Sequence, residues 1–217
     1  MIPCLDIHTH HPAPRPQAVV SSQIDGFTPW PGQLYSIGLH PWISDSVVSK
    51  EVWDEFDRLA ALPCVVAIGE CGIDKLKGGP LFKQLILFKH QIEVSEALQK
   101  PLIIHDVKAH DVIVGLKRDL NPSQKWLVHG FRGKPTVAKM LTDAGIYLSF
   151  GEKFNPESLP IVPPHMFLAE TDESPLSINE IIVALANSLG QNLEEFTSRI
   201  QKNTSDFLNL NQNESIS

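Results

Sequence analysis

The chain has 217 residues, 42% of them hydrophobic and 20% charged, which is typical of globular proteins and unlike disordered or fibrous chains. A formal charge of −7 argues against a surface that grips long nucleic acid non-specifically, because such binding depends on clusters of Lys and Arg. Cys4, Cys64 and Cys71 show neither a disulfide framework nor C-x-x-C spacing, so we interpret them as small buried apolar residues.

The N-terminal sequence MIPCLDIHTHH has no basic stretch followed by an apolar one. No apolar run approaches the ~18 residues that cross a bilayer. We therefore expect a cytoplasmic protein without a membrane segment. The length favours a single domain, at residues 1–210, and residues 211–217 are expected to form a loose tail. The oligomeric state stays open, with a monomer favoured.

Eight short runs rich in Val, Ile and Leu are the expected strands. In chain order they cover residues 4–8, 18–23, 35–39, 65–70, 101–105, 125–129, 146–150 and 166–171. Most are separated by stretches long enough for a helix, which is typical of strand–helix repeats and a parallel sheet. The pattern predicts an α/β fold of the TIM-type (β/α)8 barrel class, at the small end of its size range.

The helix between the fourth and fifth runs is the clearest, at residues 81–99, because Leu85, Phe88 and Ile92 lie near one face. The other expected helices cover about 51–61, 109–120, 135–144, 178–189 and 193–208. Between the second and third runs only about a dozen residues are available, too few for a helix and its turns. We expect an irregular crossover there, or an incomplete barrel wall near the second strand.

The first run ends in Asp6-x-His8-x-His10. Side chains alternate along a strand, so both imidazoles are expected to face the mouth of the barrel. Two histidines at this spacing can chelate a metal ion. The alternative is a solvated terminal tail.

Ionisable residues also end four later runs: Glu70 after VVAIG, His105 after PLII, His129 after KWLV and Asp172 after MFLAET. The carboxyl ends of parallel barrel strands meet at one rim, where active sites of this architecture lie. Each residue alone is as readily an ordinary polar group at a strand end. Together with the two earlier histidines they supply six nitrogen and oxygen ligands, enough for two divalent ions such as Zn, Mg or Mn.

The ordered motifs D-I-H-T-H, G-L-H-P-W, G-E-C-G-I-D, I-I-H, V-H-G-F-R-G and E-T-D-E-S-P resemble the TatD family of metal-dependent deoxyribonucleases, in the amidohydrolase superfamily. The resemblance runs from residue 6 to about 175, and residues 203–208 resemble the last helix of the family. It implies two ions with these ligands: His8, His10, Glu70 and Asp172 for one, and Glu70, His105 and His129 for the other. Glu70 is then the bridge, and Asp172 also accepts a proton from the attacking water.

Other positions of the resemblance concern the substrate. His40 and Asp74 match family positions that face the substrate or support the ligands. Where the family usually has an Arg, two positions after the strand-end His105, this sequence has Val107 followed by Lys108, which lacks the fork geometry of Arg. We still expect Lys108 to face the substrate and help to orient its phosphate. Arg132 stands where the family usually has Ser, so we expect it to bind phosphate. The alternative is a solvated loop cation.

The remaining histidines, His11, His90, His110 and His165, lack placement at a strand end, and we expect them on the surface or in support of other groups. Of the four tryptophans only Trp42, close after His40, is expected to view the pocket.

The sequence therefore predicts a TatD-like metal-dependent hydrolase that cleaves phosphodiester bonds, with exonucleolytic DNase action as the specific form. DNA or a small phosphodiester is the expected partner, and Asp172 and Glu70 are the expected catalytic carboxylates. Two alternatives stay open. One is hydrolysis of amides, lactones or small phosphoesters, because the same metal pair polarises a carbonyl group. The other is a metal-binding scaffold without turnover, since the Arg is missing and the loops are short for the family.

Overall fold

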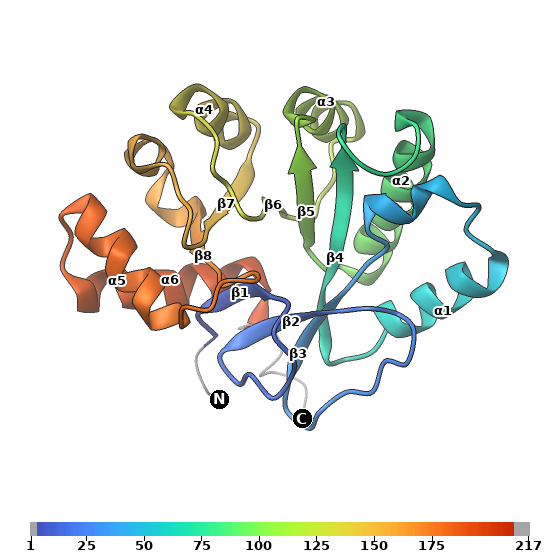
Figure 1. The fold of residues 1–217 in the computed structure, drawn as a ribbon, viewed down its shortest axis with the longest axis horizontal. Helices are drawn as coiled ribbons and strands as arrows, with labels where there is room; N and C mark the ends of the chain where they lie inside the picture. Colours follow the sequence, from blue (N-terminus) through green and yellow to red (C-terminus); the bar gives the residue numbers. More distant parts are fainter. Residues whose placement is uncertain (1–3, 211–217) are drawn as a thin grey trace.

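The computed structural model of the protein describes residues 4–210. Eight parallel strands form a closed barrel in sequence order (Figure 1). They are β1 (Asp6–Thr9), β2 (Ala18–Ser22), β3 (Leu34–Ile37), β4 (Val65–Asp74), β5 (Leu102–Val107), β6 (Trp126–Val128), β7 (Ile146–Phe150) and β8 (Phe167–Ala169). The pairing of Asp6 with Ala169 closes β8 onto β1. The predicted eight-stranded α/β barrel is confirmed.

The six expected helices are all present, close to their predicted bounds. They are α1 (Lys50–Ala60), α2 (Leu81–Leu98), α3 (His110–Leu120), α4 (Pro135–Asp143), α5 (Ile178–Leu189) and α6 (Leu193–Phe207), with short 3-10 helices η1 (Pro41–Asp45), η2 (Pro156–Ile161) and η3 (Pro164–Met166). Figure 1 shows loops between β1 and β2 and between β2 and β3, and helices along the rest of the chain from α1 onward. None of the described helices combines the length and the apolar character needed to span a bilayer.

The crossovers from β1 to β2 and from β2 to β3 contain no helix in the described chain. The irregular crossover is confirmed, but the alternative of an incomplete wall is wrong, because β2 pairs with both neighbouring strands. The buried Gln33 side chain joins these segments: its amide donates to the carbonyl oxygens of Ala18 (2.8 Å) and Leu34 (3.0 Å), and its oxygen accepts from the Arg15 amide (2.6 Å). The Gln33 side chain thus satisfies backbone groups of β2, of β3 and of the β1–β2 crossover.

The core has two layers separated by the barrel wall. Every strand contributes to an inner cluster that Phe207 of α6 joins, and its strand residues include Ile7, Val19, Leu34, Ala67, Ile103, Leu127, Tyr147 and Leu168. The neighbours of Ile103 on β5, Leu102 and Ile104, belong to the outer cluster under the helices. This alternation follows from the two-residue period of a strand. Because apolar side chains fill the barrel interior, polar groups gather at its rim.

Candidate metal centre

The carboxyl ends of β1 and β8 bring His8, His10 and Asp172 together. The Nε2 atoms of the two histidines lie 3.2 Å apart, and Oδ1 of Asp172 lies 4.0 Å from Nε2 of His8 and 3.7 Å from that of His10. The segment after β8 is tied to β1, since the Asp172 amide donates to the His8 carbonyl and the His10 amide donates to the Asp172 carbonyl, both at 3.0 Å. Backbone pairing therefore positions the carboxylate beside the two imidazoles.

Glu70 of β4 lies at the centre of the cluster. Its Oε2 atom is 3.2 Å from Nε2 of His10. Its Oε1 atom faces a different set of rings, at 2.6 Å from Nδ1 of His105, 2.7 Å from Nε2 of His129 and 3.3 Å from Nε2 of His40. The two oxygens of one carboxylate thus point at two groups of imidazoles.

The electrostatics of Glu70 and His8 favour the metal-binding forms of these two groups. Burial alone would raise the pKa of Glu70, but the charge of His129 and hydrogen bonds from His10 and His105 hold that pKa well below its usual value. Burial, together with His129, holds the pKa of His8 well below its usual value. An ionised carboxylate and a neutral imidazole are the forms that bind metal.

The donor set fits a divalent ion. Four groups of three ligand atoms, each group within 4.8 Å, occur in the described residues: His8–His10–Asp172, His8–Glu70–His129, His40–Glu70–His105 and His129–Glu170–Asp172. All the donors are imidazole nitrogens and carboxylate oxygens, without a thiolate, which suits Zn, Mn or Mg better than thiolate-preferring metals. The free cysteines stay out of the centre, with Cys4 and Cys71 buried and Cys64 half-buried.

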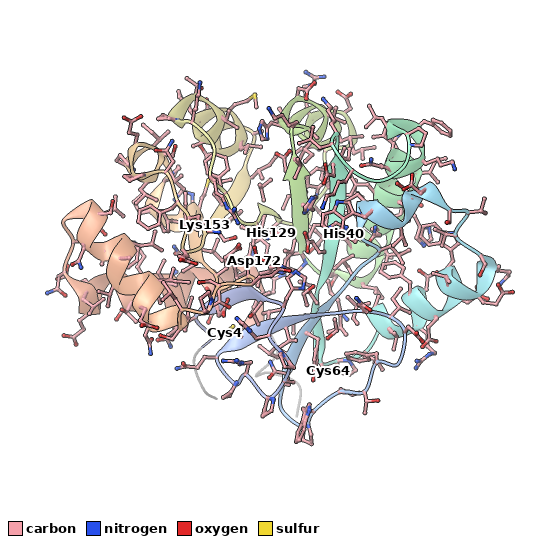
Figure 2. The ribbon with its side chains drawn as sticks, in the orientation of Figure 1. Cys4, His40, Cys64, His129, Lys153 and Asp172 are labelled. Atoms are coloured by element: carbon pink, nitrogen blue, oxygen red, sulfur yellow. The ribbon has the colours of Figure 1, made fainter. Side chains whose placement is uncertain are left out.

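Figure 2 shows His40, His129 and Asp172 toward the carboxyl ends of the strands, with Cys4 and Cys64 toward the opposite end. A hollow of about 470 Å³ lies over the centre, and His10, His40, Trp42, Glu70, His105, His129 and Asp172 are among its lining residues. The molecule therefore has space for a substrate directly above the cluster.

Two carboxylates that support this arrangement have no role assigned from the sequence. Glu170 is fully buried, with Oε1 at 3.5 Å from Nδ1 of His129, and it accepts a hydrogen bond from Ser149. Asp6 accepts from the amide (2.9 Å) and the hydroxyl (2.7 Å) of Thr171, which holds the segment carrying Asp172. A signal was present for both, because Asp6 precedes His8 by two residues and Glu170 precedes Asp172 by two, the spacing of side chains on one strand face.

The expected substrate-facing residues divide into three cases. His40 and Asp74 lie among the imidazoles of the cluster: Oδ2 of the buried Asp74 is 3.3 Å from Nε2 of His105 and accepts from the Trp42 indole at 2.7 Å. Arg132 reaches the centre from outside, with Nη2 at 3.8 Å from Oδ2 of Asp172. Lys108 is exposed on the β5–α3 loop and is not among the residues that line the hollow.

Three of the other four histidines have polar partners elsewhere in the described chain. His11 contacts the Ser174 carbonyl, His90 contacts Asp57 and His110 contacts Asp106, while His165 is exposed on η3. Their placement agrees with the expectation that they lie on the surface or support other groups.

A closed α/β barrel whose strand ends gather histidines and carboxylates under an open hollow has the architecture of a TIM-barrel metalloenzyme. Residues 29–209 match the family model of TatD related DNases, so the chain belongs to that family. The resemblance seen in the short motifs is confirmed.

This chain matches its curated relatives over only part of their length. An uncharacterized metal-dependent hydrolase TatD from Mycobacterium tuberculosis is 29% identical over 157 residues, covering 66% of this chain and 59% of that protein. A 3′-5′ ssDNA/RNA exonuclease TatD from Pantoea is 30% identical over 168 residues, covering 71% of this chain and 64% of that protein. The chain thus spans less than two thirds of the length of these relatives.

Solved structures resemble this chain closely in fold but only weakly in sequence. The TatD homologue YjjV from Escherichia coli superposes with a TM-score of 0.82 at 18% identity, covering 95% of this chain and 98% of that one. A TatD family hydrolase from Entamoeba histolytica superposes with a TM-score of 0.70 at 17% identity, over 80% and 74% of the two chains. These likenesses show a shared barrel.

Proposed function

We propose that the chain is a metal-dependent phosphodiesterase that cleaves single-stranded nucleic acid from an end. The observation that carries the proposal is the position of Glu70, whose two oxygens face two separate groups of imidazoles. A carboxylate in this position suits a bridge between two ions. The names of exonuclease relatives support nucleic acid as the substrate class.

The ligand sets proposed from the family pattern are His8, His10, Glu70 and Asp172 for one ion, and Glu70, His105 and His129 for the other. Zn, Mn or Mg bound there would supply positive charge that polarises a phosphoryl group and stabilises the leaving oxygen. The distance of 3.3 Å between His40 and Glu70 makes His40 a further candidate ligand.

The chain's own groups bind and orient the substrate in this proposal. Asp172 borders the hollow and accepts the proton of the attacking water. Arg132, beside Asp172 and exposed, orients the phosphate. Asp74 holds His105 by its Nε2 atom, which leaves Nδ1 directed at Glu70. We also propose that the protein is cytoplasmic and monomeric, with one domain at residues 1–210. The tail expected at 211–217 lies outside the described residues.

The test compares Glu70→Ala with Glu93→Ala, in which an exposed carboxylate on α2 is removed. Metal content would be measured in protein prepared without chelator, and hydrolysis would be assayed on single-stranded oligonucleotides, a simple phosphodiester and a lactone. We expect Glu70→Ala to lose metal and at least about a thousandfold of phosphodiesterase activity, because a bound cation supplies several kcal/mol of charge stabilisation. Full activity in this variant contradicts the proposal. Lactone hydrolysis alone indicates a carbonyl substrate, and bound metal without any turnover indicates a scaffold.

A further inference from the structure

Trp42 is an exposed aromatic side chain held rigidly at the edge of the hollow. It lies on η1, the first element after β3, and 46% of the residue is exposed. Its indole N–H donates to Oδ2 of Asp74 at 2.7 Å, and its backbone amide donates to Nδ1 of His40 at 3.3 Å. Asp74 is only 3% exposed. A large apolar ring anchored to a buried carboxylate, yet open to solvent, is arranged in advance to receive a ligand.

The indole contacts two different groups. The ring of His40 lies at 4.5 Å between centroids and at 74° to the indole, so this contact links Trp42 to the metal centre. The Nζ atom of the exposed Lys77 lies over the indole at 4.1 Å from its centroid. A lysine side chain is flexible and keeps its charge near water, so it is a readily displaced occupant of that face.

These contacts match the two parts of a nucleotide. A base can stack on the indole in place of the lysine, and the displaced ammonium can pair with the negatively charged backbone. Stacking tolerates any sequence, because every base has a flat face. A local platform is also what a protein with a formal charge of −7 needs, since its overall field does not attract a polyanion.

We propose that Trp42 is a base-stacking residue, which binds the nucleobase beside the scissile phosphate while Lys77 moves from the ring to the phosphate backbone. The proposal rests on the nucleic-acid substrate of the proposed function. It makes the chain selective for single-stranded nucleotides over phosphodiesters that have no base. If Trp42 acted only by holding Asp74 and, through it, His105, substrates with and without a base would be affected equally.

The test uses two oligomers of equal length: an oligothymidylate, and its counterpart in which every sugar is abasic. The metal-loaded enzyme is compared with Trp42→Ala, Trp42→Phe and the control Trp30→Ala. Trp30 is 55% exposed on the β2–β3 crossover and does not line the hollow. The values of kcat and KM would be measured for each pair.

We expect Trp42→Ala to lower kcat/KM on the oligothymidylate by roughly 5- to 150-fold, the range that stacking of one base supplies. Its effect on the abasic oligomer is expected to be much smaller. Trp42→Phe keeps a ring but loses the indole N–H, so it should retain most of the preference for the base. Trp30→Ala should match the unmodified protein. Equal losses on both oligomers in Trp42→Ala, or no loss on either, overturn the proposal.

A second measurement keeps the inference separate from the proposed function. If the unmodified protein cleaves neither oligomer, the proposed function fails, while stacking is tested by binding of thymidine 5′-monophosphate and deoxyribose 5-phosphate to the metal-loaded protein. Stacking predicts tighter binding of the nucleotide, and Trp42→Ala should remove the difference. Equal affinities for the two phosphates in the unmodified protein overturn the inference.

Discussion

Oε1 of Glu170 lies 3.5 Å from Nδ1 of His129, and within the described residues neither atom has a hydrogen-bond partner. The other ring nitrogen of His129 is 2.7 Å from Glu70. Burial opposes a charge on His129, yet Glu70 and Glu170 together hold the pKa of this imidazole well above its usual value. Glu170 thus lies where a carboxylate can orient a metal-binding imidazole from behind.

Glu170→Gln should therefore weaken metal binding. A carboxylate behind a ligand histidine fixes the ring and raises its basicity, and its loss typically costs about 10- to 100-fold in metal affinity. Affinity would be measured by competition with a chromogenic chelator. Glu157→Gln, an exposed carboxylate on η2, is the control. An unchanged affinity in Glu170→Gln would show that His129 is oriented without this carboxylate.

Added metal should raise the melting temperature of the protein. An ion that binds only the folded state stabilises it by mass action, by about 2.7 kcal/mol at a hundred times Kd. The described cluster of imidazoles and carboxylates forms only on folding, because its members come from β1 and the residue directly after it, from β4 and β5, from the segments after β6 and β8 and, for His40, from the loop after β3. Calorimetry with and without chelator would measure the shift. Glu70→Ala should lose the shift, whereas Glu93→Ala should keep it.

Arg132→Ala should raise KM for a phosphodiester by about tenfold and change kcat less, because a charge-assisted hydrogen bond to phosphate is worth about 1.5–3 kcal/mol. The side chain is 57% exposed and only 3.8 Å from Asp172, so it can reach a substrate over the centre. KM would be measured at two salt concentrations, and its salt dependence should decrease in the variant. Arg118→Ala on α3 is the control, since that side chain is 76% exposed and pairs with Asp119. The same KM in both variants would contradict phosphate binding by Arg132.

Gly72 and Gly115 should respond oppositely to alanine. Gly72 has φ 131°, and a Cβ there would lie 2.2 Å from the His105 carbonyl oxygen, so Gly72→Ala forces β4 away from β5. At Gly115, inside α3, a Cβ meets no atom within 4 Å. We expect Gly115→Ala to raise the free energy of unfolding by about 0.5–1 kcal/mol and Gly72→Ala to lower it. Urea denaturation measures both, and a stabilised Gly72→Ala would contradict the close approach of the strands.

Because of Lys100, the free energy of unfolding should increase with pH in the alkaline range. Burial lowers the pKa of its ammonium from 10.5 to about 8, while Nζ donates to the carbonyl oxygens of Ala60 and Leu62. Above pH 8 the folded state releases a proton that the unfolded state still binds, so this group adds stability as pH rises toward 10.5. The free energy of unfolding, relative to that of Lys100→Met, should therefore increase between pH 7 and pH 9.5. A constant difference would contradict the lowered pKa.

The strand ends of the site were predictable from local patterns. His105 follows PLII and lies near the carboxyl end of β5, and His129 follows KWLV and comes directly after β6. Glu70 follows VVAIG but lies inside β4, because that strand continues to Asp74 rather than ending at residue 70. Parallel strands bring such ends to one rim, so the sequence sufficed to place these side chains near one another. Their roles in catalysis and metal binding stay predictions.

Contacts between distant segments were not predictable in this way. Lys108 is close to His105 in the sequence, yet it is exposed and does not line the hollow, whereas His40 approaches Glu70 to 3.3 Å. Lys108 has φ 57°, so the backbone leaves the extended conformation of the strand at this residue. The alternation of side chains along a strand therefore cannot predict where Lys108 points.

The sequence by itself determined the barrel class and the set of ligand types, because strand period and strand ends are local properties of the chain. Only the tertiary structure decided which oxygen of Glu70 faces which imidazole, that Glu170 stands behind His129, and that Gln33 joins the crossovers of a complete wall. These relationships depend on how the strands stagger and how the loops pack, and such non-local packing is set by the whole fold.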